Sequence, residues 1–252
     1  PFADVFLENL TFDIEVVAEE EPPLEFFKEE MEKYRRQREA IHAMRLSMVV
    51  GILILDADSL QKLFMPEAVR CLQDLEGLLP QIGHRKNESF LEDINHGIST
   101  LSLTPQSVEE FVTHLQFMAV LNDRQDDMQN DYEDIKKIYE LLESKGVLVP
   151  AEELALYQTL VPTYNALKSS LAISDASKDE AITKFSSDLE KMISKLRHDI
   201  VELRQLAQHQ MIASPDSQPE EVLEYLGDLS TRFQKCADLA ARYKSHQQLF
   251  KV

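Results

Sequence analysis

Apolar residues recur every three or four positions between Pro105 and Lys145, and no glycine or further proline interrupts them. This spacing places them on one face of an α-helix, so we predict a single long helix with one packing seam, about 60 Å long at 1.5 Å per residue. The seam skips a turn at Asn122–Asp127, where polar residues open it to water or to a partner. The seam residues are Val108, Phe111, Leu115, Met118, Leu121, Met128, Tyr132, Ile135, Tyr139 and Leu142.

Both ends of this helix carry local signals. Thr104 supplies an N-cap side chain and Pro105 a first-turn proline. At the other end, Gly146 suits the left-handed cap conformation, an apolar residue follows it, and Pro150 prevents the helix from continuing.

A second helix is expected from Pro150 or Ala151 to about Leu171. Pro162 lies inside it and predicts a kink or a break, because the proline ring clashes with the preceding turn. Its apolar positions are Leu154, Tyr157, Leu160, Tyr164, Leu167 and Leu171.

Two capping boxes predict the starts of a third and a fourth helix, one at Ser177–Glu180 and one formed by Ser217 and Glu220. Short turns leave no length of chain to return along such helices, so neighbours must be antiparallel. The third stripe is Ile182, Phe185, Leu189, Met192, Leu196, Leu203 and Leu206, and the fourth is Val222, Leu226, Leu229, Phe233, Cys236, Ala240, Tyr243 and Phe250.

The first 104 residues have a mixed pattern. Apolar residues alternate with polar ones from Leu10 to Val16, which predicts a strand, and the nearly continuous apolar run 46–55 predicts a second strand or buried extended segment that could pair with it. We expect a helix cap at Asp58 or Ser59. The helices expected here are 24–44, with an inner stripe of Phe27, Met31, Tyr34 and Ile41, and 66–79 and 87–101, separated by a loop at Pro80, Gly83 and His84.

Together these elements predict a mainly α fold. The expected architecture is an elongated, antiparallel, spectrin-like helical bundle with coiled-coil seams and a small mixed α/β N-terminal part. We place the domain boundary between an N-terminal subdomain, residues 1–104, and a long-helix bundle, residues 105–252.

The net charge of −19 argues against binding to nucleic acid, to anionic membranes or directly to the acidic surface of a microtubule. Arg35, Arg36 and Arg38 form one basic cluster, but Glu29, Glu30, Glu32 and Glu39 lie within helical pairing distance. A solvated, ion-paired face is therefore the favoured interpretation of this cluster. The chain begins at Pro1 rather than Met, which suggests a segment of a larger polypeptide.

The sequence presents no set of residues for catalysis, so we assign no catalytic, cofactor-binding or metal-binding residues. There is no GxxxxGK[ST] phosphate loop and no HExxH, and the seven histidines are scattered. The run after Asp56 resembles the start of a calcium loop, but Leu60 has no side-chain oxygen and Gln61 replaces the turn glycine. We interpret His114 as a boundary residue or as one with satisfied hydrogen bonds rather than as a ligand, and the acidic residues Asp123, Asp126, Asp127 and Asp131 as a solvated face.

Two further motifs receive structural interpretations. Cys71 and Cys236 are far apart in the sequence and form no CxxC, so each is expected to be a small core residue. The glycosylation sequons at Asn9 and Asn87 are taken as chance matches, because no signal peptide or secretory context accompanies them.

Three stretches of the chain resemble the tail of dynein heavy chains. They are EEFVTHLQFMAVLNDRQDDMQNDYEDIKKIYELLESKGVLVPAEELALYQTL in the central helices, the upstream VVGILILDADSLQKLFMPEA, and the C-terminal RYKSHQQLFKV. The last is similar to the helix that leads into the linker of the motor. The resemblance covers most of residues 46–252, and axonemal members are the more similar ones.

The resemblance implies a non-catalytic tail segment immediately N-terminal to the linker, in a ciliary, microtubule-based motor. ATP and Mg²⁺ would bind in the motor domain of the parent protein, outside these residues. Expected partners are other heavy-chain regions, neighbouring heavy chains, and intermediate or light chains. The alternative from another functional class is a coiled-coil or spectrin-like adaptor or tether unrelated to motors.

Overall fold

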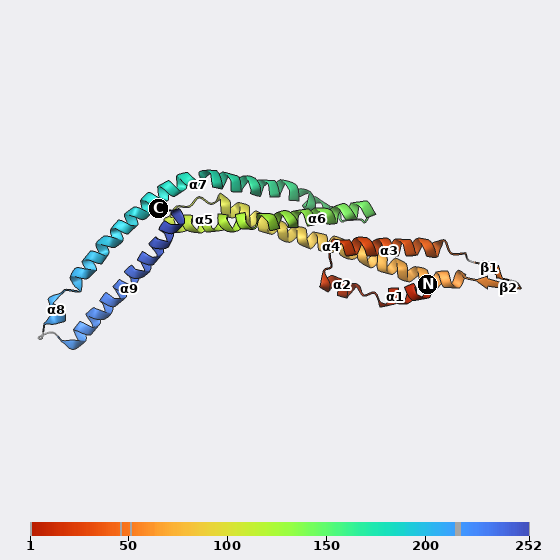
Figure 1. Cartoon of the computed structure of the whole chain (residues 1–252), viewed down its shortest axis with the longest axis horizontal. Helices are drawn as coiled ribbons and strands as arrows, with labels where there is room; N and C mark the ends of the chain where they lie inside the picture. The colour runs from red at the N-terminus through yellow and green to blue at the C-terminus, as the bar shows by residue number, and fades with distance from the viewer. Residues whose placement is uncertain (1, 46, 51, 215–217, 252) are drawn as a thin grey trace. The chain divides into compact units, whose positions relative to one another are not determined.

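The protein is built almost entirely of helices in the computed structural model, which describes residues 2–45, 47–50, 52–214 and 218–251 (Figure 1). In chain order the elements are α1 (Phe2–Thr11), α2 (Ile14–Glu20), α3 (Leu24–His42), β1 (Ser47–Val50), β2 (Leu53–Asp56), α4 (Asp58–Ser102), α5 (Val108–Asp123), α6 (Gln125–Lys145), α7 (Ala151–Leu206), α8 (Gln210–Ala213) and α9 (Pro219–Phe250). The predicted helical-bundle class is therefore confirmed.

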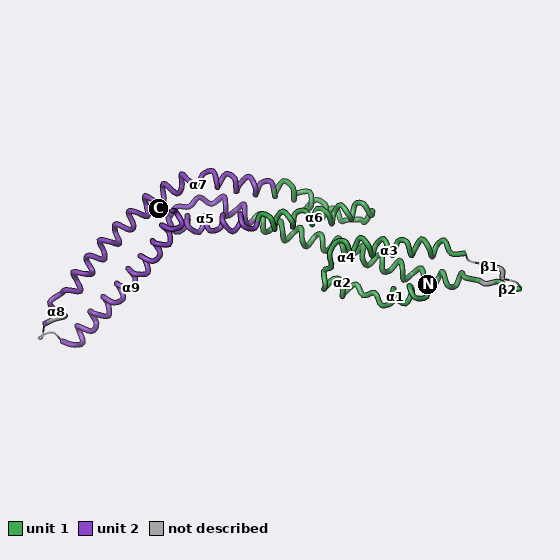
Figure 2. Tube along the Cα trace, in the orientation of Figure 1, with its two compact units in different colours: residues 1–95, 125–164 green, residues 96–124, 165–252 purple. Residues whose placement is uncertain are grey.

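The chain divides into two compact units, each assembled from separate stretches of sequence (Figure 2). Unit 1 contains residues 1–95 and 125–164, and unit 2 contains residues 96–124 and 165–252. Helices α4 and α7 each contribute residues to both units. The boundary that the sequence suggests between residues 104 and 105 stays a prediction.

The small mixed α/β part predicted at the N-terminal end is not supported, because the strand expected from Leu10 to Val16 is wrong. The alternating residues from Leu10 to Val16 belong to α1 and α2, which are separated at Asp13, whose carboxylate accepts the N–H of Glu15 and caps α2. The ring of Phe12 packs edge-on against Tyr34 of α3 at 5.5 Å between centroids. Packing against α3 thus overrides a two-residue alternation that was short enough to be accidental.

The apolar run 46–55 forms no sheet with the N-terminal residues. Strands β1 and β2 form an antiparallel hairpin, with Ser47 opposite Asp56 and Val50 opposite Leu53. Residues 46 and 51 lie outside the described residues. The expected cap at Asp58 or Ser59 is also wrong, because α4 already begins at Asp58.

Helix α4 is continuous where two helices and a loop were expected. It runs through Pro66 and Pro80, and Gly83 lies in its interior. A Cβ built at Gly83 would lie 2.9 Å from Cγ2 of Ile138 in α6, so this glycine permits close helix packing rather than a turn. The four residues expected to lie inside α3 are all buried, which confirms that stripe: Phe27, Met31, Tyr34 and Ile41.

The central helix is interrupted once, at Arg124, where α5 ends and α6 begins. Its N-cap is Ser107 rather than Thr104. The Ser107 hydroxyl accepts the N–H of Glu110, and the Glu110 carboxylate accepts the N–H of Gln106. At the other end, Gly146 has φ of +67°, and the N–H of Val147 donates to the carbonyl of Leu142, so the predicted stop is confirmed.

Helix α7 replaces two predicted helices, because neither Pro162 nor the Ser177 capping box ends or starts a helix. The Ser177 hydroxyl instead donates to the carbonyl of Ser174 within the helix. Helix α9 begins at Pro219 after Gln218, which makes no side-chain cap bond, and Ser217 lies outside the described residues.

The core of unit 2 joins three helices. Phe111 of α5 stacks on Phe185 of α7 at 4.6 Å and contacts Phe250 of α9 at 5.5 Å. These rings fix α5 against the antiparallel pair formed by α7 and α9. The other buried members of this core are Val108, Val112, Leu115, Leu189, Leu196 and Tyr243.

Candidate functional site

The polar interruption of the central seam is the most specific local feature that the sequence singles out. Leu121 and Met128, which flank it, are both buried, whereas every residue from Asn122 to Asp127 is exposed. The carboxylates of Asp123, Asp126 and Asp127 therefore face solvent in the isolated chain, as an acidic solvated face would.

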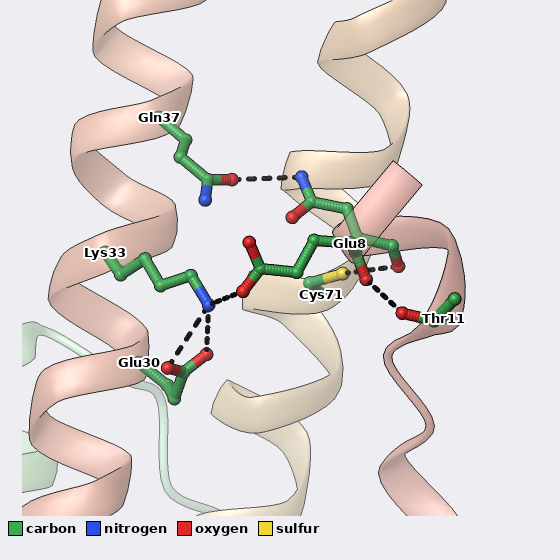
Figure 3. A network of polar contacts seen from close by, with 7 residues as sticks. Glu8, Thr11, Glu30, Lys33, Gln37 and Cys71 are labelled. Carbon is green, nitrogen blue, oxygen red and sulfur yellow. Dashed lines mark hydrogen bonds and ion pairs between the residues drawn. The ribbon is translucent and has the colours of Figure 1, made fainter. Parts of the chain in front are cut away.

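A partly buried polar network links α1, α3 and α4 in unit 1. The Lys33 ammonium binds the Glu8 carboxylate at 2.8 Å and the Glu30 carboxylate at 3.1 Å (Figure 3). Burial alone would lower the pKa of Lys33, but the hydrogen bonds to both carboxylates outweigh it and raise this pKa. The lysine thus stays charged and fixes α1 to α3.

Asn9 is the centre of the same network and is almost fully buried. Its side-chain amide donates to Gln37 at 2.9 Å, while its backbone carbonyl accepts from Arg70 at 2.9 Å and from the Cys71 thiol at 3.5 Å. Burial raises the pKa of Cys71, so the thiol is a weak nucleophile. Asn87 of the second sequon is also fully buried, so neither sequon asparagine is accessible in the folded chain.

The basic cluster on α3 is occupied by structural contacts. Arg35 donates to the backbone carbonyl of Lys145, at the end of α6, over 2.6 Å, and pairs with Glu76 of α4 at 2.9 Å. Lys145 in turn pairs with Glu32 of α3 at 2.8 Å, and this hydrogen bond is the main reason for the lowered pKa of Glu32. The favoured interpretation of this cluster as a solvated, ion-paired face is confirmed for Arg36, which binds Glu32, but not for Arg35, which is half-buried and binds other helices.

Two clefts of unit 1 are lined by both acidic and basic side chains. One cleft of about 360 Å³ between α4 and α6 is lined by Arg85, Lys86, Asp131 and Asp134 among others. A second, of about 300 Å³, shares Lys86 and Asp134 and extends to Pro22 and Pro23. Neither contains a histidine or a cysteine in its lining.

The residues of the rejected calcium loop make other contacts. Asp58 pairs with Lys62, and Glu67, at the twelfth position of that loop, pairs with Arg70. Among the described residues no three His, Cys, Asp or Glu side chains group closely enough to hold a metal ion. His114 is half-buried, and burial lowers its pKa. The absence of catalytic, cofactor and metal residues stays a prediction.

Stacked aromatic rings join α6 to α7 within unit 1. Tyr139 stacks on Tyr157 with 3.9 Å between ring centroids, and Tyr132 stacks on Tyr164 at 5.0 Å. Phe90 of α4 contacts Tyr164 at 5.7 Å. Burial raises the pKa of Tyr139 to about 12. Tyr132, Tyr139 and Tyr157 lie in the central stretch that carries the resemblance to dynein tails, so the family-like pattern coincides with helix packing.

The comparison with known proteins points to the same family. Human dynein axonemal heavy chain 6 is 26% identical over 251 residues, which is 100% of this chain. The chain is homologous to dynein heavy chains. Human dynein axonemal heavy chain 14 is 25% identical over 157 residues, or 62% of the chain. No protein-family model matches the sequence.

The chain corresponds to a small part of these dynein heavy chains, 6% of the length of the first and 4% of the second. The homology therefore supports a segment of a motor protein. Among the described residues, no helix is both long enough and apolar enough to cross a bilayer.

Proposed function

We propose that this chain is a non-catalytic structural segment of a dynein heavy-chain tail, immediately N-terminal to the linker. It connects the anchored end of the heavy chain to the linker and the ATPase ring. The observation that carries the proposal is the homology over all of the chain to an axonemal dynein heavy chain, in a segment made of helices of up to 56 residues.

The helical architecture supports a mechanical role. A long helix transmits displacement along its axis, since each residue is held by a hydrogen bond to the residue four before it. Helices α4 and α7 are continuous over 45 and 56 residues. Ion pairs such as Arg35 with Glu76 and stacks such as Phe111 on Phe185 fix the helices laterally.

The proposed setting is the ciliary axoneme, where other heavy-chain regions, neighbouring heavy chains, and intermediate or light chains would dock on exposed helical faces. ATP and Mg²⁺ would act in the motor domain of the parent heavy chain. A tether unrelated to motors is the rival function, and the homology argues against it.

The purified chain offers a direct test. We expect no ATP turnover, no saturable ATP binding and no co-sedimentation with microtubules. In a purified axonemal dynein, chemical cross-links from this segment should reach heavy-chain or accessory-subunit lysines. Saturable ATP turnover by the purified chain would overturn the non-catalytic assignment, and cross-links confined to unrelated proteins would overturn the tail assignment.

A further inference from the structure

Helices α7 and α9 form an antiparallel pair. Helix α5 covers the inner half of this pair, whereas no third helix among the described residues covers its outer half, residues 197–242. In unit 2, α5 packs across the inner half through Phe111, which contacts both Phe185 and Phe250. From residue 197 to residue 242, only Leu203 and Leu229 are buried among the described residues. Figure 1 shows α7 and α9 continuing as a pair beyond α5.

One side of this outer pair is polar. A cleft of about 250 Å³ runs between the helices, lined by Asp199 and Glu202 of α7 and by Arg232 and Lys235 of α9. Two acidic residues thus face two basic residues across the cleft. The two acidic and two basic residues give this side no net charge.

The opposite side is apolar. Ile200 follows Asp199 in the sequence, and Phe233 follows Arg232. Successive side chains of a helix are about 100° apart around its axis. Ile200 and Phe233 therefore lie on the other side of the seam from the polar cleft. Leu226 lies two turns before Phe233 on the same face. Ile200 is 39% exposed, and Leu226 and Phe233 are each 41% exposed. We call these three residues the apolar strip.

Two arginines flank the strip on α7. Arg197 and Arg204 lie three residues before and four residues after Ile200, so they share its helical face. Both are exposed, and neither guanidinium has a hydrogen-bonded or ion-paired partner among the described residues. On α9 the neighbouring positions are Leu223, which is 69% exposed, and the uncharged Ser230. The rim of the strip is therefore basic, in a chain of net charge −19.

We propose that the apolar strip docks an amphipathic helix of a partner protein, with its apolar face on Ile200, Leu226 and Phe233 and an acidic flank on Arg197 and Arg204. This proposal rests on the proposed structural function and specifies one docking face. The helix would complete a three-helix bundle in the outer half, as α5 does in the inner half. Carboxylates on its flank would bind the two guanidinium groups bidentately.

A second copy of this chain is a poorer occupant. Two copies would bring the arginines of both chains together, which is unfavourable for like charges.

The test uses the whole 252-residue chain and two synthetic peptides. Both are 21-residue helical peptides with leucine at every third or fourth position, one flanked by glutamates and the other by lysines in the same places. We expect the glutamate peptide to bind, by fluorescence anisotropy, at least tenfold more tightly than the lysine peptide. Arg197→Glu combined with Arg204→Glu should reverse this preference, and these exposed substitutions leave packing intact.

The apolar contribution is tested by Leu226→Ser combined with Phe233→Ser, which should weaken binding of the glutamate peptide at least tenfold. The matched control, Arg232→Ala with Lys235→Ala in the polar cleft, should leave binding unchanged. Equal binding of both peptides, or equal binding by the Leu226 and Phe233 variant, would overturn the proposal. Dimers in sedimentation that this variant abolishes would assign the strip to a second copy and overturn it as well. The tail function is tested separately, by ATP turnover and cross-linking. Failure of the docking proposal can therefore be distinguished from failure of the proposed function.

Discussion

Arg35 of α3 donates a hydrogen bond to the last carbonyl of α6, that of Lys145, while pairing with Glu76 of α4. One guanidinium thereby joins three helices, although Arg35 and Lys145 lie 110 residues apart in the sequence. The carbonyl at the end of a helix has no intrahelical partner and carries partial negative charge, so a cation there is stabilising.

Arg35→Met should therefore destabilise the chain by about 1–2 kcal/mol, because a half-buried carbonyl and carboxylate lose their donor. Urea unfolding followed by circular dichroism measures the change. Arg38→Met is the matched control on the same helix, at an exposed position, and should change stability by less than about 0.5 kcal/mol. Equal effects of the two substitutions would show that Arg35 contributes nothing specific.

Two glycines of α4 should respond to alanine with opposite signs. A Cβ at Gly77 has no atom within 4 Å, so Gly77→Ala should stabilise the helix by up to about 1 kcal/mol. A Cβ at Gly83 meets buried Ile138 at 2.9 Å, and the overpacking should cost about 1–3 kcal/mol, more than the helix gains.

Thermal unfolding of the two variants checks the difference. Adding Ile138→Val to Gly83→Ala should recover part of the loss, because it removes a methyl group from the crowded site. Stabilisation by both alanines would mean that α4 and α6 do not approach as closely as described.

Tyr139 should make the fold sensitive to alkaline pH. Its pKa in the folded chain is about 12, raised mainly by burial, against an ordinary value of 10.0. Because the folded state favours the neutral phenol, this stability contribution is present below pH 10 and is lost as the pH rises through 12. The phenol oxygen has no hydrogen-bond partner in the described residues, so Tyr139→Phe should fold normally.

Ultraviolet titration of tyrosinate absorbance, together with unfolding curves between pH 9 and pH 12, measures both effects. The wild-type chain should lose more stability over this interval than Tyr139→Phe does. Parallel losses in the two proteins would place the ionisation of Tyr139 at its ordinary pKa.

The polar interruption between α5 and α6 should tolerate leucine. Asp123 is exposed at the last position of α5, so Asp123→Leu should change the free energy of unfolding by less than about 0.5 kcal/mol. A gain of more than about 1 kcal/mol would indicate that the position is buried in solution. If the interruption instead contacts a partner, the same variant should fold normally and assemble poorly into the parent dynein.

Long helical periodicity is the part of this fold that the sequence predicted best. The stripes of α3 and of the central seam are buried nearly as expected, with Tyr132 half-buried, because burial of one face dominates helix packing. Helix starts were predicted less well. The Ser177 motif lies inside α7, where the apolar stripe continues on both sides of it, and the true capping box at Ser107 and Glu110 lies three residues after the expected cap.

Proline and glycine were overestimated as helix breakers. Pro80 and Gly83 lie inside α4, and their sequence neighbours Leu79 and Ile82 are buried. Tertiary packing of this segment thus offsets the hydrogen bond lost at the proline and the low helix propensity of the glycine. The contacts between distant elements, such as Arg35 with Lys145, could not be predicted, since no local pattern identifies a partner 110 residues away. The apolar strip could not be predicted from the sequence for a related reason. Leu226 and Phe233 fit the helical stripe, and only the structure shows that this half of α9 meets one helix instead of two.

We propose that this segment transmits force within a dynein heavy chain and takes no part in ATP hydrolysis. The proposal is tested most directly by replacing this 252-residue segment of the parent heavy chain with a Gly/Ser linker of the same length. The replacement keeps the connection and removes the helices. We predict unchanged ATP turnover per motor and a several-fold lower stall force in a single-molecule assay anchored upstream of the segment. An unchanged stall force, or a loss of ATP turnover, would contradict the claim.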